Sequence, residues 1–376
     1  MDKLPKSKKI LYYLIYLSVL LVITLMLGET YVRLFSRQGY LTPNIQKKNS
    51  LQYVPSLYAR HLFPEQEQTI KGAYNNILHI SNRGYRGNDF KFEKDSNVTR
   101  IIIYGGSAVF DQAATEGKDW PHLVEKLLNE RGFSVEVINA GIPGHTSIDS
   151  FERLFLEGHL FDPDYVAVYN AWNDIKYFKT KKPLLRIYKP YDESQDPFQN
   201  YQGWLDRFLC EHSQFYVRVR NRYFRWKLNI DTEGVKKKVS LSSEFYEIGL
   251  RQYKLNMEMF VDCARNIGAT PILITQARLV SKDNTAADRN KIIYEYTELT
   301  HEALLKAFEQ CDQILYQVAK EKEVHIIDAS KAMTGKSDFF IDHVHLTPKG
   351  SSMIAEIVAQ NMTGIMTSDM NITRKK

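Results

Sequence analysis

From residue 99 onward the sequence alternates between short apolar segments and longer amphipathic ones, and this alternation limits the fold most strongly. Five segments have the composition of buried strands, at residues 100–104, 134–139, 165–169, 270–275 and 325–328. The intervening and following segments have helical spacing, at residues 117–131, 147–158, 244–267, 290–322 and 348–361. Strands that alternate with helices form a parallel sheet with helices on both faces. The predicted fold is therefore an α/β, three-layer α/β/α sandwich with a five-stranded parallel sheet.

The N-terminus carries a separate signal. Lys3, Lys6, Lys8 and Lys9 precede residues 10–27, a run of 18 residues without a charge, which is just long enough to cross a bilayer as a helix. A cleavable signal peptide is the alternative, but the run is long for one and no small-residue cleavage site follows. Only Arg33 and Arg37 follow closely, so the positive-inside rule predicts a single-pass anchor with a cytoplasmic N-terminus and the rest of the chain outside the cytoplasm.

These patterns divide the chain into four parts. Residues 1–35 form the cytoplasmic tip and anchor, and the polar residues 36–98 form a stalk or N-terminal extension with weak strand signals at 77–80. Residues 99–362 form the main domain, and 363–376 a polar tail. Within the main domain, residues 176–243 interrupt the alternation and are dense in aromatic and basic side chains. They are interpreted as a cap over the site, a surface that faces lipid head groups or an acidic glycan, or a structural insertion; residues 217–227 fit a strand and a helix equally well.

Charge and cysteine usage narrow the functional classes. The net charge of +6 is spread along the chain, so it does not predict nucleic-acid binding. Cys210, Cys263 and Cys311 lie far apart and are odd in number, which argues against a disulfide framework and a zinc site, although one pair could still form. No His, Asp or Glu cluster has metal-ligand spacing, and we expect neither a metal nor another cofactor.

Four polar stretches each follow a predicted strand or precede the last helix: Gly-Gly-Ser at 105–107, NAGIPGHTS at 139–147, YNAWNDI at 169–175 and DHVHLTPKG at 342–350. The carboxyl ends of parallel strands meet at one edge of a sheet, where open α/β sheets bind their ligands. We therefore expect these stretches to form one site.

The residue types in these stretches suit ester cleavage, which needs a nucleophile, a base, an orienting acid and oxyanion donors. Ser107 is the candidate nucleophile, and its hydroxyl needs a base. His345 has a suitable intrinsic pKa, and Asp342 can reach its other ring nitrogen. His343 is a rival base, but it should point away from His345 on an extended loop, so we interpret it as a loop or core-edge residue.

The candidate oxyanion hole combines the backbone N–H groups of Ser107 and Gly144 with the side-chain amide of Asn173. Gly141 is the alternative to Gly144. Three further residues are candidates for the pocket: Gly106, His145, which is either pocket lining or a solvated loop residue, and Asp174, which we expect to orient its loop by capping.

Taken together, Ser107, Gly144, Asn173 and the Asp342/His345 pair resemble the four conserved blocks of the SGNH hydrolases, also called the GDSL esterase and lipase family. The resemblance covers residues 99–362 and implies a flavodoxin-like sandwich that hydrolyses esters. Register with the second block favours Gly144 over Gly141. One departure is Gly-Gly-Ser in place of the family's usual Gly-Asp-Ser, a form that resembles a membrane-anchored subgroup and that removes any role of that aspartate.

The resemblance and the anchor together predict a membrane-anchored serine esterase whose substrate is an acyl ester, of an O-acylated glycan or a lipid. An acyltransferase that uses the same triad is one alternative, because the acylation step is common to both reactions. A catalytically inactive binding or assembly module is the other. The acyl chain, the alcohol and the oligomeric state are left open.

Overall fold

The computed structural model of the chain describes residues 5–35, 42, 53–54, 61–62, 66–70, 76–179, 197–198, 200–228 and 240–373. The chain divides into two compact units. The first comprises Met1–Asn49 and Tyr191–Lys237, and the second comprises Ser50–Pro190 and Lys238–Lys376. The second unit contains the alternating strands and helices.

A five-stranded parallel sheet forms the centre of the second unit, in the order β6-β5-β7-β8-β9. Its strands are β5 (Thr99–Gly105), β6 (Val135–Gly141), β7 (Tyr165–Tyr169), β8 (Thr270–Ile274) and β9 (His325–Ile327). The predicted fold class is confirmed. The first strand of the sheet, β5, lies between the second, β6, and the third, β7, so the strand order reverses at β5. In open α/β sheets ligands bind at the carboxyl ends of the strands where the order reverses.

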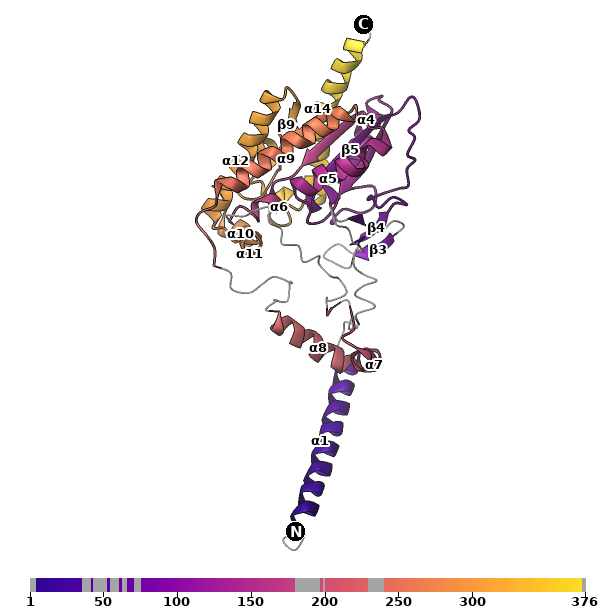
Figure 1. The fold of residues 1–376 in the computed structure, drawn as a ribbon, viewed down its shortest axis with the longest axis vertical. Helices are drawn as coiled ribbons and strands as arrows, with labels where there is room; N and C mark the ends of the chain where they lie inside the picture. Colours follow the sequence, from indigo (N-terminus) through magenta and orange to yellow (C-terminus); the bar gives the residue numbers. More distant parts are fainter. Residues whose placement is uncertain are drawn as a thin grey trace. The chain divides into compact units, whose positions relative to one another are not determined.

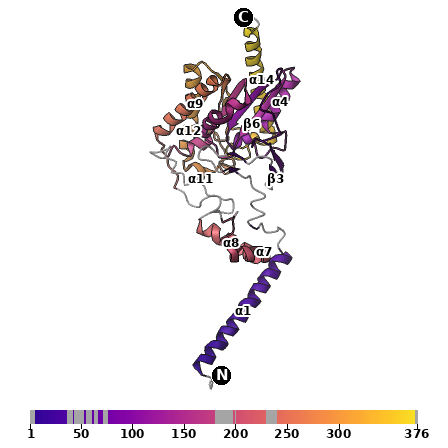
Figure 2. The same ribbon diagram turned by 45° about the vertical axis from the view of Figure 1, so that its right-hand side comes forward.

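Helices cover both faces of this sheet, as Figures 1 and 2 show. On one face α4 (Trp120–Glu130) packs against α14 (Pro348–Thr373), and on the other α9 (Glu247–Asn266) packs against both α5 (Ser147–Glu157) and α12 (His301–Glu321). Strands β5, β6, β7 and β8 between them are buried along almost their whole length, as the apolar runs predict, whereas the edge strand β9 begins at the exposed His325. Short helices fill the connections: α3 (Ser107–Phe110), α6 (Trp172–Ile175), α10 (Ala286–Arg289), α11 (Tyr294–Thr297) and α13 (Ala329–Met333), with 3₁₀ turns at Gly158–Phe161 and Ser337–Phe339.

Two predicted helices have different bounds. The stretch 290–322 is broken, because Glu298 adopts a left-handed φ of 57° after α11 and Thr300 then caps a new helix by accepting from the N–H of Ala303. The last helix continues past residue 361 to Thr373, through most of the predicted polar tail. Met362 and Met366 are buried on that extension, so its apolar side chains keep it packed on the domain.

Part of the predicted stalk belongs to this fold. Strands β3 (Gln66–Ile70) and β4 (Asn76–Ile80) form an antiparallel pair, and β1 (Tyr53–Val54) pairs with β2 (His61–Leu62). Single bridges then connect Ile80 to Arg86 and Arg86 to Asn139 in β6. Leu78 and Ile80 are buried with Phe110 beside the main core, so residues 76–98 pack on the domain.

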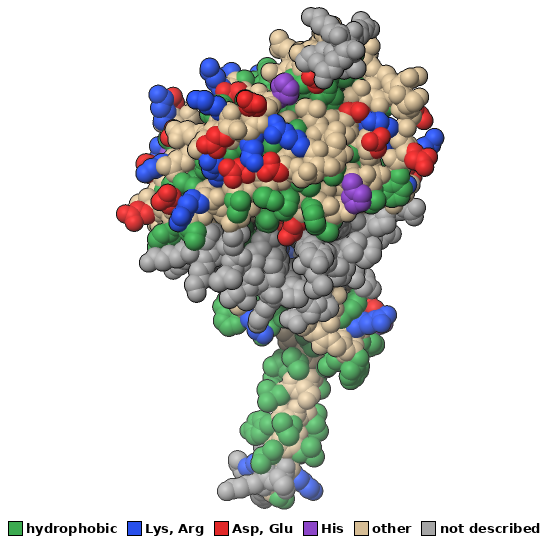
Figure 3. All heavy atoms as spheres, turned by 45° about the horizontal axis from the view of Figure 1, so that its top comes forward, with side chains coloured by type: hydrophobic (Ala, Val, Ile, Leu, Met, Phe, Trp, Pro, Cys, Tyr) green, Lys and Arg blue, Asp and Glu red, His purple; other side chains and the backbone are tan. Residues whose placement is uncertain are grey.

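The first unit contains α1 (Lys6–Phe35), α7 (Trp204–His212) and α8 (Gln214–Lys227). Helix α1 is long and apolar enough to cross a membrane over Lys8–Phe35, and Figure 3 shows hydrophobic side chains along it. The ambiguous segment 217–227 is helical. Val217 and Arg220, three positions apart, are both buried on one face. This spacing fits the helical period of 3.6 residues better than the two-residue alternation of a strand. Cys210, Cys263 and Cys311 are all buried and free.

Candidate active site

Ser107, His345 and Asp342 form a continuous hydrogen-bonded chain. The Oγ of Ser107 lies 2.8 Å from Nε2 of His345, and the Nδ1 of His345 lies 2.6 Å from Oδ2 of Asp342. All three side chains are partly buried. Ser107 is the first residue of α3, directly after β5, and the other two lie on the loop between β9 and α14. Residues 238 positions apart in the sequence therefore meet at the carboxyl edge of the sheet.

The Asp342 carboxylate is fixed by its own loop. Its Oδ1 accepts from the backbone N–H groups of Val344 and His345, at 3.0 and 2.9 Å. Burial alone raises the pKa of this carboxyl group, but its hydrogen bond to His345, the neighbouring imidazoles and the backbone N–H outweigh burial and hold the pKa well below its ordinary value. Asp342 is therefore ionised near neutral pH and can orient the imidazole of His345.

His343 lies beside His345, with 5.4 Å between the centroids of the two rings, and its Nδ1 lies 3.5 Å from Oδ1 of Asp342. Its ring stacks on Trp172 with 3.8 Å between centroids, and its backbone carbonyl accepts from the N–H of Leu279. Burial lowers the pKa of His343 to about 3, more than the nearby Asp342 raises it. His343 is neutral near pH 7 and is buried, as interpreted from the sequence. The expectation that it points away from His345 is wrong, because the two rings are in contact.

Replacing His343 with phenylalanine should make the fold less sensitive to mild acid. Folded His343 has a pKa of about 3 against 6.5 for an ordinary histidine, so between these values the unfolded chain binds more protons. Stability therefore rises with pH in this window, by at most about 1.4 kcal/mol per pH unit. Phenylalanine keeps a ring on Trp172 and removes that slope.

The measurement is the drop in melting temperature from about pH 7 to about pH 4.5, which should be smaller in H343F than in the wild type. Burial raises the pKa of Asp111 to about 6, so that group contributes a slope of opposite sign. It contributes equally to both proteins, and the comparison cancels it. An equal drop in both would contradict a buried, neutral His343.

The turn that presents Ser107 requires a small residue at Gly106. A Cβ atom on Gly106 would lie 2.6 Å from Nδ2 of Asn173 and 2.9 Å from the carbonyl oxygen of His145, closer than real Cβ contacts. An aspartate there, as in the Gly-Asp-Ser of the family that the sequence resembles, would have to displace the Asn173 amide or the His145 carbonyl. Glycine at position 106 therefore allows the Asn173 amide and the His145 carbonyl to lie close to the backbone before Ser107.

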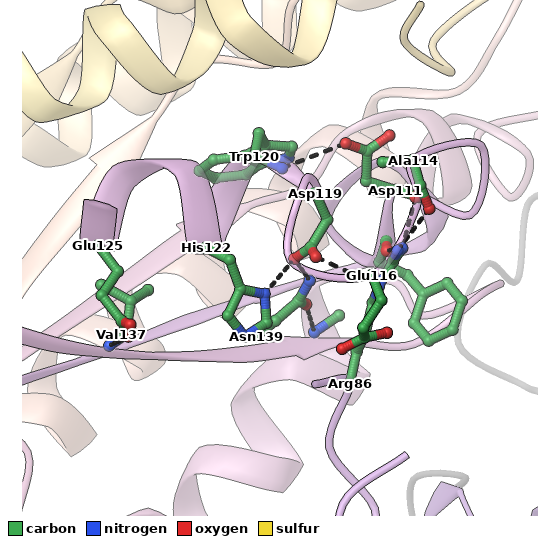
Figure 4. A network of polar contacts seen from close by, with 12 residues as sticks. Arg86, Asp111, Ala114, Glu116, Asp119, Trp120, His122, Glu125, Val137 and Asn139 are labelled. Carbon is green, nitrogen blue, oxygen red and sulfur yellow. Dashed lines mark hydrogen bonds and ion pairs between the residues drawn. The ribbon is translucent and has the colours of Figure 1, made fainter. Parts of the chain in front are cut away.

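A buried arginine from the N-terminal extension closes the other end of this turn. Arg86 donates to the carbonyl oxygens of Phe110 and Asp111, and to that of Ala114 at 2.7 Å. Phe110 is the last residue of α3, Asp111 is its C-cap and Ala114 lies in the turn that follows, so Arg86 binds carbonyls at and just beyond the end of this helix. Arg86 also lies 3.5 Å from the buried carboxylate of Asp119, and Figure 4 shows the two facing each other.

The Asp119 carboxylate connects Arg86 to strand β6. It accepts from the Asn139 amide at 2.8 Å and contacts the His122 ring at 2.7 Å. The charges of Arg86 and His122 lower the pKa of Asp119 against the effect of burial. Losing one partner of such a buried pair leaves the other charge uncompensated, which typically costs about 3–5 kcal/mol. We infer that Arg86 helps to hold Ser107 in place.

The backbone N–H groups of Ser107 and Gly144 are two of the predicted oxyanion donors. Among the residues that the structure describes, the N–H groups of Ser107 and Gly144 make no hydrogen bond. Gly144 adopts a left-handed φ of 85°, which favours glycine. The alternative donor, the N–H of Gly141, is bonded to Oδ1 of Asn139 at 3.0 Å. The structure therefore favours Gly144 over Gly141 as a donor to a ligand.

The Asn173 amide is held from both ends. Its Nδ2 donates to the carbonyl of His145 at 2.8 Å, and its Oδ1 accepts from the hydroxyl of Tyr296 at 2.9 Å. These bonds fix which end of the amide carries the N–H groups, and one N–H of Nδ2 stays available beyond the bond to His145. Because Nδ2 lies against Gly106, it is placed to donate to a group bound at Ser107.

The two remaining candidates support the loops. Asp174 accepts from the backbone N–H of Ser147, at 3.1 Å, and from its hydroxyl, so it caps the start of α5 and connects the second and third polar stretches. His145 is buried, and its carbonyl accepts from the amides of Asn170 and Asn173.

Several supporting residues were not found from the sequence. Trp172 stacks on both His343 and Tyr296, so it connects the loop that carries Asp342 to the hydrogen-bond partner of Asn173. Trp172 adjoins Asn173, and that adjacency was an available signal. Tyr296 and Arg86 had none, because one lies in a stretch interpreted as continuous helix and the other in a stretch interpreted as stalk.

One group of possible metal ligands occurs among the described residues. The ligand atoms of Asp342, His343 and His345 lie within 4.8 Å of one another. However, Asp342 Oδ2 and His345 Nδ1 are already hydrogen-bonded to each other. An ion bound there would break the chain that leads to Ser107, so this donor set does not fit a resident metal.

Comparison with known proteins gives likenesses of fold at low identity. No family model matches the sequence, and no curated protein does. Similar solved structures include a lipase/acylhydrolase from Enterococcus faecalis, with 17% identity over 71% of this chain and 96% of that chain and a TM-score of 0.42. A putative lipolytic protein of the G-D-S-L family from Desulfitobacterium hafniense has 11% identity over 70% and 98%, with a TM-score of 0.39. A catalytic mutant of an acetylxylan esterase from Geobacillus stearothermophilus has 13% identity over 70% and 93%, with a TM-score of 0.41.

Proposed function

We propose that this chain is a membrane-anchored serine ester hydrolase of the SGNH type, with Ser107, His345 and Asp342 as its triad. One observation carries the proposal: Ser107 Oγ, the His345 ring and the Asp342 carboxylate are joined by hydrogen bonds of 2.8 and 2.6 Å. A nucleophile in contact with a base, and that base in contact with an orienting carboxylate, is the geometry of acyl transfer through serine.

In the proposed reaction Ser107 Oγ attacks the ester carbonyl carbon while its proton passes to Nε2 of His345. The N–H groups of Ser107, Gly144 and Asn173 stabilise the oxyanion. His345 then gives the proton to the leaving alcohol, which departs as the acyl-serine forms. Water, deprotonated by His345, attacks the acyl-serine, and the acid is released as His345 returns the proton to Ser107 Oγ. Asp342 stays ionised throughout and balances the imidazolium.

Two assays test this function together. The purified chain should be labelled at Ser107 by a serine-directed fluorophosphonate, and it should hydrolyse a p-nitrophenyl acetate ester with water as the sole acceptor. Labelling without hydrolysis, with turnover restored by an added sugar acceptor, would make the chain an acyltransferase. Absence of labelling in a folded sample would exclude a serine enzyme and favour a binding module.

Anchoring by α1 gives a separate prediction. Deleting residues 2–27 should release a domain that stays in the supernatant after ultracentrifugation and keeps its esterase activity. A cut after residue 35, the end of the predicted anchor, would also remove Glu29, which contacts three consecutive residues at the start of α8. Deletion through residue 98 should abolish folding, because Arg86 and the buried Leu78 and Ile80 are lost.

The orientation is tested by protease digestion of intact cells or spheroplasts carrying the full chain. The positive-inside rule predicts that the catalytic domain is digested without breaking the membrane. Protection until lysis would place the domain in the cytoplasm and would contradict the proposed extracytoplasmic substrate.

A further inference from the structure

Helix α8 carries an apolar stripe on its exposed side. Val219, Tyr223 and Trp226 follow the i, i+4, i+7 spacing of a single helix face and are 49%, 49% and 77% exposed. The exposed basic side chains of Arg222 and Lys227 flank this stripe on either side. Val217 and Arg220 of the same helix are buried. Such exposure of large apolar side chains between basic ones is unusual for a surface in water.

The neighbouring helix α7 also exposes apolar side chains. Trp204, Leu205 and Phe208 are exposed, Trp204 by 81%, whereas Asp206 and Cys210 of the same helix are buried. The α7–α8 surface, defined here as Trp204, Leu205, Phe208, Val219, Tyr223 and Trp226 with Arg222 and Lys227, thus contains two of the four tryptophans of the chain.

A buried ion pair holds the two helices together. The Arg220 guanidinium donates to both carboxylate oxygens of Asp206, at 2.6 and 2.8 Å, and the hydroxyl of Tyr216 donates to the same carboxylate at 2.8 Å. A bidentate pair of this kind fixes relative orientation as well as distance. The exposed apolar side chains therefore belong to a defined helical pair and not to two independent helices.

Helix α1 contacts this pair through its C-terminal part. Its Glu29 accepts from the hydroxyl of Ser213 and from the backbone N–H groups of Gln214 and Phe215, at 2.7–3.0 Å, so a carboxylate from α1 caps α8. The ring of Phe215 lies against Gly28, where a Cβ atom would be 3.0 Å away. Gly28 directly follows the uncharged run 10–27. Helices α7 and α8 are thus fixed beside the end of the apolar run, and Figures 1 and 2 both show the two helices next to that end of α1.

We propose that the α7–α8 surface lies on the membrane into which α1 inserts, with its aromatic and aliphatic side chains among the lipid head groups and its basic side chains on anionic phospholipids. Tryptophan and tyrosine favour this interface, and basic residues beside an apolar helix face are typical of helices that lie in its plane. The inference rests on the proposed anchoring by α1, because that helix brings the surface to the bilayer.

A lipid partner explains the composition better than an acidic glycan does. Glycan recognition accounts for the basic residues and for some aromatic stacking, but not for exposed Leu205, Phe208 and Val219. These side chains gain free energy when apolar surface leaves water, and acyl chains next to the end of α1 provide the apolar medium.

Tryptophan quenching by brominated lipid tests the proposal on the full chain. The chain is reconstituted into nanodiscs of phosphatidylcholine and phosphatidylglycerol brominated near the upper end of the acyl chains. Trp204 and Trp226 should be quenched, whereas Trp120 and Trp172 are buried in the second unit. The W204F/W226F variant should lose most of the quenching, and flotation with the discs checks that α1 is inserted.

The charge requirement has a matched control. R222Q/K227Q should reduce quenching in discs that contain phosphatidylglycerol but not in pure phosphatidylcholine, since each basic residue at an anionic surface changes partitioning about fivefold. Lys126 and Lys331 are exposed in the second unit, and K126Q/K331Q should leave quenching unchanged.

The outcomes separate the possible failures. A chain that does not float with the discs refutes the anchor, and with it the premise. A chain that floats without quenching of Trp204 and Trp226 refutes the membrane contact alone, and a change in their fluorescence on adding a soluble polyuronate would then assign the surface to an acidic glycan. Equal loss of quenching in K126Q/K331Q would refute the role of the two flanking charges.

Discussion

Replacing Ser107 with alanine should lower kcat for ester hydrolysis by about 10³-fold or more. The change removes the oxygen that lies 2.8 Å from His345 Nε2 and leaves the oxyanion donors and substrate contacts in place. A residual rate above that in water should therefore remain, as it does when a triad is disabled but its oxyanion hole is intact. KM should change little, because the hydroxyl contributes chiefly to the chemical step.

His345→Ala should cost a similar factor, and the double variant little more, because the two residues act as a unit. His343→Phe is the matched control from the same loop. Its ring stacks on Trp172 and not on the nucleophile, so kcat at neutral pH should stay near the wild-type value. Turnover by purified Ser107→Ala at the wild-type rate would remove Ser107 from the mechanism, and a loss in His343→Phe equal to that in His345→Ala would remove the distinction between the two histidines.

The sheet was predictable because each strand is a short apolar run next to a helical period. Strand β7 is predicted to the residue, at Tyr165–Tyr169, since a fully buried parallel strand needs no alternation. The break at Glu298 was not predictable, because nothing in its residue type requires a left-handed φ. The extension of α14 was missed because its polar composition hides the buried Met362 and Met366.

The candidate site also has a part that was predictable from the sequence and a part that was not. The predicted association of Ser107 with Asp342 and His345 followed from where the stretches fall relative to the strands, and the hydrogen bonds between them agree with it. The groups that hold these residues come from elsewhere in the chain. Arg86 acts through three carbonyls, and a carbonyl acceptor leaves no mark in a sequence. Tertiary contacts of this kind are visible only once the fold is known.

Asn173→Ala should lower kcat by about 10²–10³-fold if the amide donates to the oxyanion, since a preorganised donor in a partly buried site contributes about 3–4 kcal/mol to the transition state. Tyr296→Phe offers a graded comparison. It keeps Asn173 but removes the hydroxyl that donates to Asn173 Oδ1 at 2.9 Å, so the amide loses its orientation and not its N–H groups. Its effect on kcat should be clearly smaller than that of Asn173→Ala and should leave the stacking on Trp172 intact.

The contacts of Asn173 predict how a purely structural role would appear in unfolding measurements. Asn173 is buried and donates to the carbonyl of His145, so alanine at this position leaves that carbonyl without this donor, although Asn170 still donates to it at 3.1 Å. Thermal unfolding should therefore show only a modest loss, of about 1–2 kcal/mol for one hydrogen bond. If instead Asn173→Ala and Tyr296→Phe lose melting temperature in proportion to their loss of kcat, the amide is a support for the loop that carries His145. The oxyanion would then depend on the backbone N–H groups of Ser107 and Gly144 alone.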